Sequence, residues 1–154
     1  MKKQTNNVHF SSESDNWATP QDFFDRCNQE FGPFDLDVCA TESNHKCQKF
    51  YSLENDGLQQ EWTGRVWMNP PYGRTIKQWM KKAFESANTT AQIVVCLVPA
   101  RTDTAWWHDY AANGQVRFIR GRLKFGGHKN SAPFPSALII FRKHETNWSF
   151  RQRN

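Results

Sequence analysis

Long apolar runs are scarce in these 154 residues, and their scarcity already excludes one class of protein. The longest run, Ile93 to Val98, is the length of a strand, whereas a membrane helix needs about 20 apolar residues. No apolar stretch follows the opening Met-Lys-Lys-Gln-Thr-Asn-Asn, so we expect no signal peptide. The sequence therefore predicts a cytoplasmic protein without a membrane partner.

Cysteine is also sparse, and its spacing does not suit a metal. The four cysteines contain no Cys-x-x-Cys pair. Cys39, His45 and Cys47 lie close in sequence, but a structural zinc ion takes four ligands and this group offers three at most. We expect reduced thiols, as in other cytoplasmic proteins, and no metal site.

Acidic residues are nearly absent from the last part of the chain. Residues 115–154 hold nine Lys or Arg against a single acid, Glu145, whereas residues 1–114 hold eleven against fourteen. The net charge of +5 is thus concentrated at one end. Such a basic region favours a polyanionic partner whose binding weakens with salt, although a merely solvated basic face would look the same.

The length suits one domain with one core. Residues 1–16 are polar and rich in Asn and Ser, which predicts a flexible tail ahead of a single domain over residues 17–150. Thr19 is a good N-cap and Pro20 suits a first helical position, so a helix is expected from about 20 to 31. Apolar spacing predicts further helices over 75–87 and from about 104 to 112, and strands over 34–39, 66–68, 92–98, 115–120, 122–125 and 137–141.

The stretch Asn69-Pro70-Pro71-Tyr72-Gly73 interrupts this pattern directly after a strand. Each proline fixes its own φ and keeps the residue before it out of the helical region, so a stiff, extended turn is expected. The amide oxygen of Asn69 and the carbonyl of Pro70 could accept hydrogen bonds from the exocyclic amine of a nucleobase and localise its lone pair. Tyr72 would offer a flat face to an extruded base.

The turn matches the catalytic motif of S-adenosylmethionine-dependent amino-methyltransferases, and the wider pattern resembles the small, mostly phage-encoded DNA N6-adenine methyltransferase (Dam) family. The resemblance implies an α/β protein with a compact, abridged Rossmann-like methyltransferase fold, whose mostly parallel sheet ends in a hairpin. It rests on ordered motifs that span nearly the whole chain, namely Trp17-Ala18-Thr19-Pro20, Phe34 to Ala40, Asp56-Gly57-Leu58, Trp62-Thr63-Gly64, the turn itself and Ala132 to Ile139.

The resemblance also implies S-adenosyl-L-methionine as cofactor. Asp37 stands where related enzymes bind the cofactor's amino group, and Asp56 where they bind its adenine amine. A strand-end structural carboxylate and an Asp-Gly turn are the competing interpretations. The usual glycine-rich loop is missing, and Glu42 and Glu54 both remain open as the ribose-binding acid. The expected cofactor residues are Trp17, Thr19, Pro20, Asp37, Cys39, Ala40, Asp56, Gly57, Leu58 and Asn69, with apolar walls from Leu58, Trp62 and Trp67.

For DNA, basic side chains that position phosphates are expected on the loops near the turn. Phe125 would pack against the flipped base, unless it is simply a buried strand residue. The predicted DNA-binding residues are Arg101, Arg120, Arg122, Lys124, Phe125 and Lys129.

Together these features predict methyl transfer to the exocyclic N6 of adenine in double-stranded DNA, in the host cytoplasm if the protein is phage-encoded. The base would be flipped out and the transfer direct and in line, without a covalent intermediate. Asn69, Pro70, Pro71 and Tyr72 are the predicted catalytic residues. Methylation of cytosine N4, RNA or a protein amide stays open, as does a non-catalytic nucleic-acid-binding role. The oligomeric state stays open, and a homodimer is possible because so small an enzyme could need a second copy to cover DNA. GATC as target follows from the resemblance alone.

Overall fold

The structure is a computed structural model that describes residues 16–143. The predicted tail over residues 1–16 and the predicted end of the domain at residue 150 therefore lie almost wholly outside the described residues. No helix in the described range is long and apolar enough to cross a membrane. The elements are α2 (Gln21–Phe31), β1 (Leu36–Asp37), the short 3₁₀ helix η1 (Gly57–Gln59), β2 (Gly64–Met68), α3 (Ile76–Ala87), β3 (Ala91–Pro99), α4 (Ala105–Asp109), η2 (Ala111–Asn113), β4 (Gln115–Phe118) and β5 (Ser136–Arg142).

These strands form one five-stranded sheet in the order β1-β2-β3-β5-β4. The first three strands are parallel, whereas β5 runs antiparallel to both β3 and β4. The expected mostly parallel sheet with an antiparallel final pair is confirmed. Because β1, β2 and β3 are parallel, their carboxyl ends meet at one edge, where Asp37, Asn69 and Ala100 lie.

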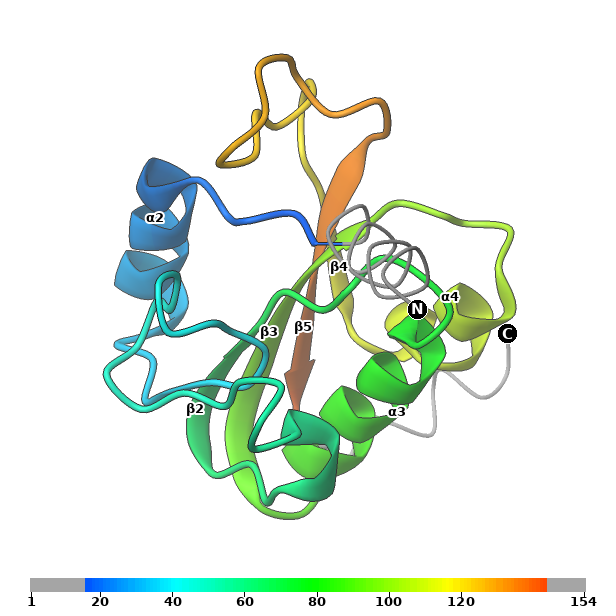
Figure 1. The fold of residues 1–154 in the computed structure, drawn as a ribbon. Helices are drawn as coiled ribbons and strands as arrows, with labels where there is room; N and C mark the ends of the chain where they lie inside the picture. Colours follow the sequence, from blue (N-terminus) through cyan, green and yellow to red (C-terminus); the bar gives the residue numbers. More distant parts are fainter. Residues whose placement is uncertain (1–15, 144–154) are drawn as a thin grey trace, which may run out of the picture.

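The two long helices cover opposite faces of the sheet (Figure 1). The Phe24 ring of α2 meets Trp67 of β2 edge to face, and Phe84 of α3 meets Phe141 of β5 in the same way. The buried residues of α3 recur every three or four positions, which gives that helix one apolar stripe. Between the helices, β3 is buried on both sides along almost its whole length, as the continuous apolar run 92–98 predicts.

Some expected boundaries are wrong, for local reasons. The first helix begins at Gln21, and Pro20 rather than Thr19 is the residue before it. The Thr19 hydroxyl instead accepts a hydrogen bond from the Asn69 side chain. The segment 122–125 is a loop, because the Leu123 carbonyl accepts from Ala132 N across a turn rather than from a neighbouring strand.

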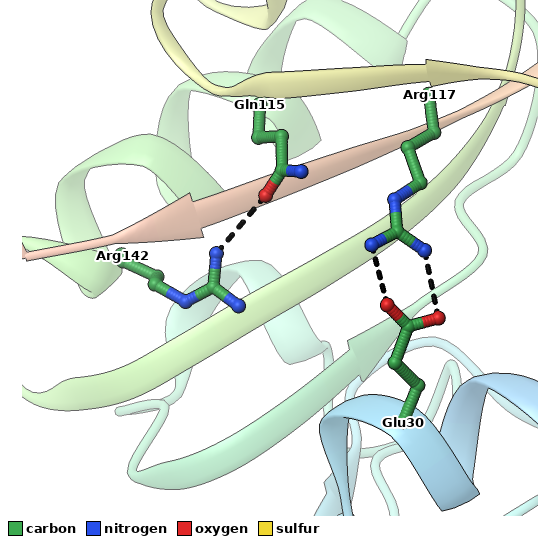
Figure 2. Close-up of polar contacts among 4 residues, drawn as sticks. All are labelled: Glu30, Gln115, Arg117 and Arg142. Atoms are coloured by element: carbon green, nitrogen blue, oxygen red, sulfur yellow. Dashed lines mark hydrogen bonds and ion pairs between the residues drawn. The ribbon is translucent and has the colours of Figure 1, made fainter.

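Part of the basic region serves the fold. The Arg117 guanidinium makes a two-pronged contact with the Glu30 carboxylate and so ties β4 to α2, and Arg142 donates to Gln115 (Figure 2). The guanidinium carbons of Arg117 and Arg142 also lie 4.9 and 5.8 Å from the centre of the Phe31 ring. The hydrogen bond from Arg117 lowers the pKa of the Glu30 carboxyl below its ordinary value. These two arginines are therefore engaged on the α2 face of the sheet.

Candidate active site

Asn69 directly follows β2 and is held from both ends of its side chain. Its Nδ2 donates to the Thr19 hydroxyl at 2.9 Å and to the Trp17 carbonyl. Its Oδ1 accepts from the Tyr72 hydroxyl at 2.8 Å, and the Leu97 carbonyl, 3.1 Å from the same hydroxyl, is a second acceptor for its single hydrogen. The turn thus joins three segments, namely the strap of residues 16–19, β2 and β3.

The Tyr72 ring lies inside an aromatic cluster of Trp17, Tyr72, Phe125, His128 and Phe134. It is only 3% exposed, and the edge-to-face partners Phe134 and Phe125 lie 5.6 and 6.2 Å away. Trp17 packs on the same two phenylalanines and stacks on His128 at 4.2 Å. Burial raises the pKa of the Tyr72 hydroxyl well above its ordinary value, so the group remains a hydrogen-bond donor. The expected flat face is present but covered by these rings.

A cavity of about 280 Å³ opens beside the turn, at the carboxyl edge of β1 and β2. Most residues predicted for the cofactor line it, and Pro20 and Leu58 do not. The predicted residues that line it are Trp17, Thr19, Asp37, Cys39, Ala40, Asp56, Gly57 and Asn69, joined by Pro70 and Pro71 of the turn. Of the expected apolar walls, Trp67 lines the cavity, while Trp62 is buried behind Trp79, which takes its place.

Asp37 supplies the buried charge of the cavity. Its side chain accepts from Lys46 N at 2.9 Å and more weakly from Cys39 N at 3.4 Å. Burial raises the pKa of this carboxyl to about 6, which leaves it ionised at neutral pH. A carboxylate withdrawn from water in this way favours a cationic ligand group as its partner. The site therefore suits an ammonium or sulfonium ion.

The residues between Thr41 and Asn55 replace the elements that are missing from the abridged fold. Asp37 forms a parallel bridge with Phe50, supported by hydrogen bonds from Asp37 N to Lys49 O and from Tyr51 N to Asp37 O. The segment 49–51 therefore runs beside β1 like a rudimentary strand and delivers Ser52 and Leu53 to the cavity. Sequence periodicity did not reveal it, because three residues are too few for a pattern.

Neither acid that remained open for the ribose lines the cavity. In place of Glu42 and Glu54, the lining includes the uncharged polar side chains of Thr41, Asn44 and Ser52. Leu53 lines it too and is 85% exposed, so an apolar side chain stands at the mouth.

Asp56 and Gly57 form the turn that the competing interpretation predicted, and they also line the cavity. The Asp56 carboxylate accepts from Leu58 N at 3.2 Å and caps η1, with Asp56 itself at a φ of +52°. A Cβ on Gly57 would lie 2.2 Å from the Val38 carbonyl oxygen, so only glycine fits there. This close approach brings η1 against the end of β1.

Most of the predicted DNA-binding residues lie on the segment between β4 and β5, which projects beyond the sheet (Figure 1). Its side chains of Arg120, Arg122, Lys124 and Lys129 are exposed. Phe125 is 1% exposed and belongs to the aromatic cluster, as its buried interpretation predicted. Arg101 follows β3, and its Nη1 donates to the Tyr72 carbonyl at 3.0 Å, which places a positive charge on the turn of residues 69–72.

Within residues 16–143, no three His, Cys, Asp or Glu side chains gather as a metal site requires. All four cysteines are free. Burial raises the pKa of Cys39, the cysteine that lines the cavity, to about 12, so it stays a neutral thiol. The cavity's chemistry is therefore that of a buried carboxylate beside an amide.

Comparison with known proteins first defines the class of fold. The structure is similar to the crystal structure of the 23S rRNA methyltransferase ErmE, with a TM-score of 0.53 and 11% sequence identity over 84% of this chain and 70% of that one. The sheet order and this likeness define a Rossmann-like methyltransferase fold.

The sequence then defines the family. The family model "DNA N-6-adenine-methyltransferase (Dam)" matches residues 6–151, and the chain belongs to that family. It is 32% identical over 148 residues to a DNA N-6-adenine-methyltransferase of Escherichia phage T1, covering 78% of this chain and 61% of that protein. It is 31% identical over 141 residues to a protein of the same description from Haemophilus phage HP1, covering 84% and 80%. The chain thus spans about three fifths of the phage T1 relative.

Proposed function

We propose that the protein transfers a methyl group from S-adenosyl-L-methionine to N6 of adenine in double-stranded DNA. The observation that carries the proposal is the Asn69 amide, fixed at the carboxyl end of β2 beside a cavity that holds the buried Asp37 carboxylate. The family and the named activity of its phage relatives support the same reaction.

The cavity residues fit the cofactor group by group. S-adenosylmethionine, when bound, supplies an electrophilic methyl group on a sulfonium. The Asp37 carboxylate would hold the ammonium of the methionine part. The Asp56 side chain and the polar groups of Thr41, Asn44 and Ser52 offer partners to the adenosine part, between the apolar surfaces of Trp67 and Trp79.

The catalytic turn would act on the substrate amine. Asn69 Oδ1 accepts one hydrogen bond from Tyr72 and, as an amide oxygen, retains capacity for a second. With the Pro70 carbonyl it would accept the two N6 hydrogens and localise the nitrogen lone pair toward the cavity. Pro71 keeps this carbonyl in place through its fixed ring. In direct in-line transfer the substrate N6 is itself the nucleophile, so the protein needs to supply positioning and exclusion of water rather than a nucleophilic side chain.

The flipped adenine would enter the aromatic cluster. Tyr72 carries the hydroxyl that meets Asn69, so a base lying on its ring reaches the amide. Phe125 and Phe134 now pack against that ring and Trp17 packs on both of them, so these side chains would have to part around the base. Base stacking on aromatic rings contributes about 1–3 kcal/mol, which offsets part of the cost of unstacking.

The exposed cations would hold the DNA backbone. Arg120, Arg122, Lys124 and Lys129 lie on the segment that carries Phe125, so phosphate contacts and base capture would come from the same segment. Arg101 adds a charge at the turn itself. A homodimer would extend this basic surface and remains part of the proposal.

A different amino-methyltransferase substrate, namely cytosine N4, RNA or a protein amide, is the second candidate. The basic segment favours a nucleic acid over a protein. Cytosine N4 enzymes more often carry Ser-Pro-Pro, so the Asn-Pro-Pro of this chain favours adenine.

The test is transfer of label from radiolabelled S-adenosylmethionine to unmethylated duplex DNA, followed by chromatography of the nucleosides. Label in N6-methyladenosine is expected, and Asn69→Ala should lower it by about a hundredfold or more, as loss of one preorganised polar group does elsewhere. Label in another nucleoside would support the proposed mechanism but show that the substrate is a different base. No transfer to DNA, RNA or protein, with no cofactor-dependent rise in Tm, would leave a nucleic-acid-binding protein without this activity.

A further inference from the structure

The two ends of an asparagine amide are similar in shape and opposite in hydrogen bonding. Oδ1 accepts hydrogen bonds, and Nδ2 only donates them. An Asn69 side chain turned by 180° would present hydrogens to the substrate amine, donor against donor. Catalysis by Asn69 therefore requires something that fixes which end faces the base.

The strap provides an acceptor for each hydrogen of the Nδ2 end, and one of the two, the Trp17 carbonyl, rejects the Oδ1 end. The Trp17 carbonyl has no hydrogen to donate, so an Oδ1 in that place would face oxygen against oxygen. The Thr19 hydroxyl accepts the other hydrogen at 2.9 Å, and Thr19 is only 5% exposed. Water has little access to replace this hydroxyl.

The opposite end of the amide is less selective. The Tyr72 hydroxyl donates to Oδ1, and its second contact is the Leu97 carbonyl, which can only accept. The phenol oxygen can also accept a hydrogen bond while its hydrogen goes to the Leu97 carbonyl, so this end of the amide accommodates either orientation. The orientation is therefore selected at the strap.

The strap itself is anchored on both sides of these contacts. The Ala18 carbonyl accepts from Gly126 N at 2.8 Å, and the two residues form an antiparallel bridge. Pro20, next to Thr19, begins the hydrogen bonding of α2 through its carbonyl, which accepts from Phe24 N. Thr19 therefore has little freedom to move away from Asn69.

We infer that Thr19 is a positioning residue whose hydroxyl bonds Nδ2 and holds the Asn69 amide against the Trp17 carbonyl, which sets the orientation in which Oδ1 faces the substrate amine. The inference rests on the proposed function and changes the role expected for Thr19, which the resemblance assigns to the cofactor. Thr19 acts through Asn69 and contacts no reacting atom.

The test compares Thr19→Val, which keeps the shape and removes the acceptor, with Thr19→Ser, which keeps the hydroxyl. In single-turnover methylation at saturating cofactor and DNA, Thr19→Val should be about tenfold slower, with the Kd for S-adenosylmethionine within twofold of wild type. Thr19→Ser should recover most of the rate. Thr90→Val is the matched control, since Thr90 is an exposed residue whose hydroxyl donates to the Trp62 carbonyl at the other end of the sheet. It should react at the wild-type rate.

Two kinetic outcomes would overturn the inference. A weaker Kd with an unchanged rate at saturation would make Thr19 a cofactor ligand. A wild-type rate and Kd in Thr19→Val would make the hydroxyl dispensable.

A second measurement needs no methyltransferase activity. In isotope-labelled wild-type protein, the side-chain NH2 of Asn69, assigned by its loss in Asn69→Asp, should exchange slowly with solvent because both hydrogens are bonded. Fast exchange would overturn the inference. Slow exchange in a wild type that methylates nothing would uphold the orientation and refute the proposed function, so the two failures are distinguishable.

Discussion

The parallel and antiparallel halves of the sheet end in groups of opposite charge at the same edge, a carboxylate in the parallel half and basic side chains in the antiparallel half. The parallel half, β1 and β2, ends in a small cavity around the buried carboxylate of Asp37, built from short loops. The antiparallel half, β4 and β5, is joined by the long segment 119–135 with its exposed cations. Under the proposed function, cofactor binding and DNA binding would therefore reside in separate parts of the fold and meet only at the turn of residues 69–72.

The largest effect is expected from removal of the Asp37 carboxylate. Asp37→Asn should weaken S-adenosylmethionine binding by about thirtyfold or more, because loss of one partner of a buried charge pair costs about 2–5 kcal/mol. Isothermal titration calorimetry measures the change, and DNA affinity should stay at its wild-type value. Asp22→Asn, on the exposed side of α2, is the control. A parallel loss of DNA affinity would show that the two sites are not separate.

The complementary change removes charge from the segment between β4 and β5. Lys124→Ala combined with Lys129→Ala should lower DNA affinity about tenfold at moderate salt and reduce the salt dependence by about two phosphate contacts. Fluorescence anisotropy across a salt series measures both.

The control for that change is Arg117→Gln. Arg117 belongs to the same basic region but is engaged with Glu30, so DNA affinity should be unchanged. This exposed ion pair contributes at most about 1 kcal/mol to folding, so the control should remain folded. Equal effects of Lys124, Lys129 and Arg117 would mean that net charge alone holds the DNA.

The pH dependence of cofactor affinity tests the role of the Asp37 charge without a mutation. Burial raises the pKa of Asp37 to about 6, so the carboxyl becomes neutral as the pH falls through that value. Cofactor affinity should therefore be constant above about pH 7 and fall by up to about tenfold per pH unit below 6. The Asp37→Asn profile should be flat over the same range. A wild-type profile without a break near pH 6 would mean that Asp37 does not bind the cofactor as a charged group.

The smallest effect is expected at the cavity mouth. Leu53 is 85% exposed, so Leu53→Ala should leave the Tm of the free protein unchanged. If the cofactor covers the Leu53 side chain, Leu53→Ala should lower the affinity for the cofactor about threefold to tenfold. This is the loss expected from removing the apolar contact of a partly buried leucine. Titration calorimetry with wild type, Leu53→Ala and Leu53→Met would show whether apolar contact is the cause. An unchanged Kd would place the cofactor deeper in the cavity.

The features that the sequence predicts correctly depend on residues close together in the chain. The position of Asn69 after a strand follows from two prolines, and α3 and β3 follow from their apolar patterns. The Dam family resemblance, carried by ordered motifs, is confirmed.

The missed features depend on contacts between distant segments. The bridge of Phe50 to Asp37 has no pattern of its own, and it brings Ser52 and Leu53 to the cavity. The Thr19 hydroxyl looks like an N-cap in sequence but meets Asn69, which is fifty positions further along the chain. Local sequence propensity cannot predict this contact, because Thr19 meets Asn69 only after the strap has packed on the rest of the fold.

The shortness of both outer strands has a consequence for aggregation. β1 has two paired residues, and the backbone of Lys49 and Tyr51 already takes up hydrogen-bonding groups of Asp37 on its outer side. β4 has four residues and carries the charged Arg117. Long, flat, unpaired edges are what allow sheets of separate molecules to join. A methyltransferase sheet with such short edge strands exposes few unpaired backbone N–H and C=O groups. Its small size therefore gives some protection from edge-to-edge association.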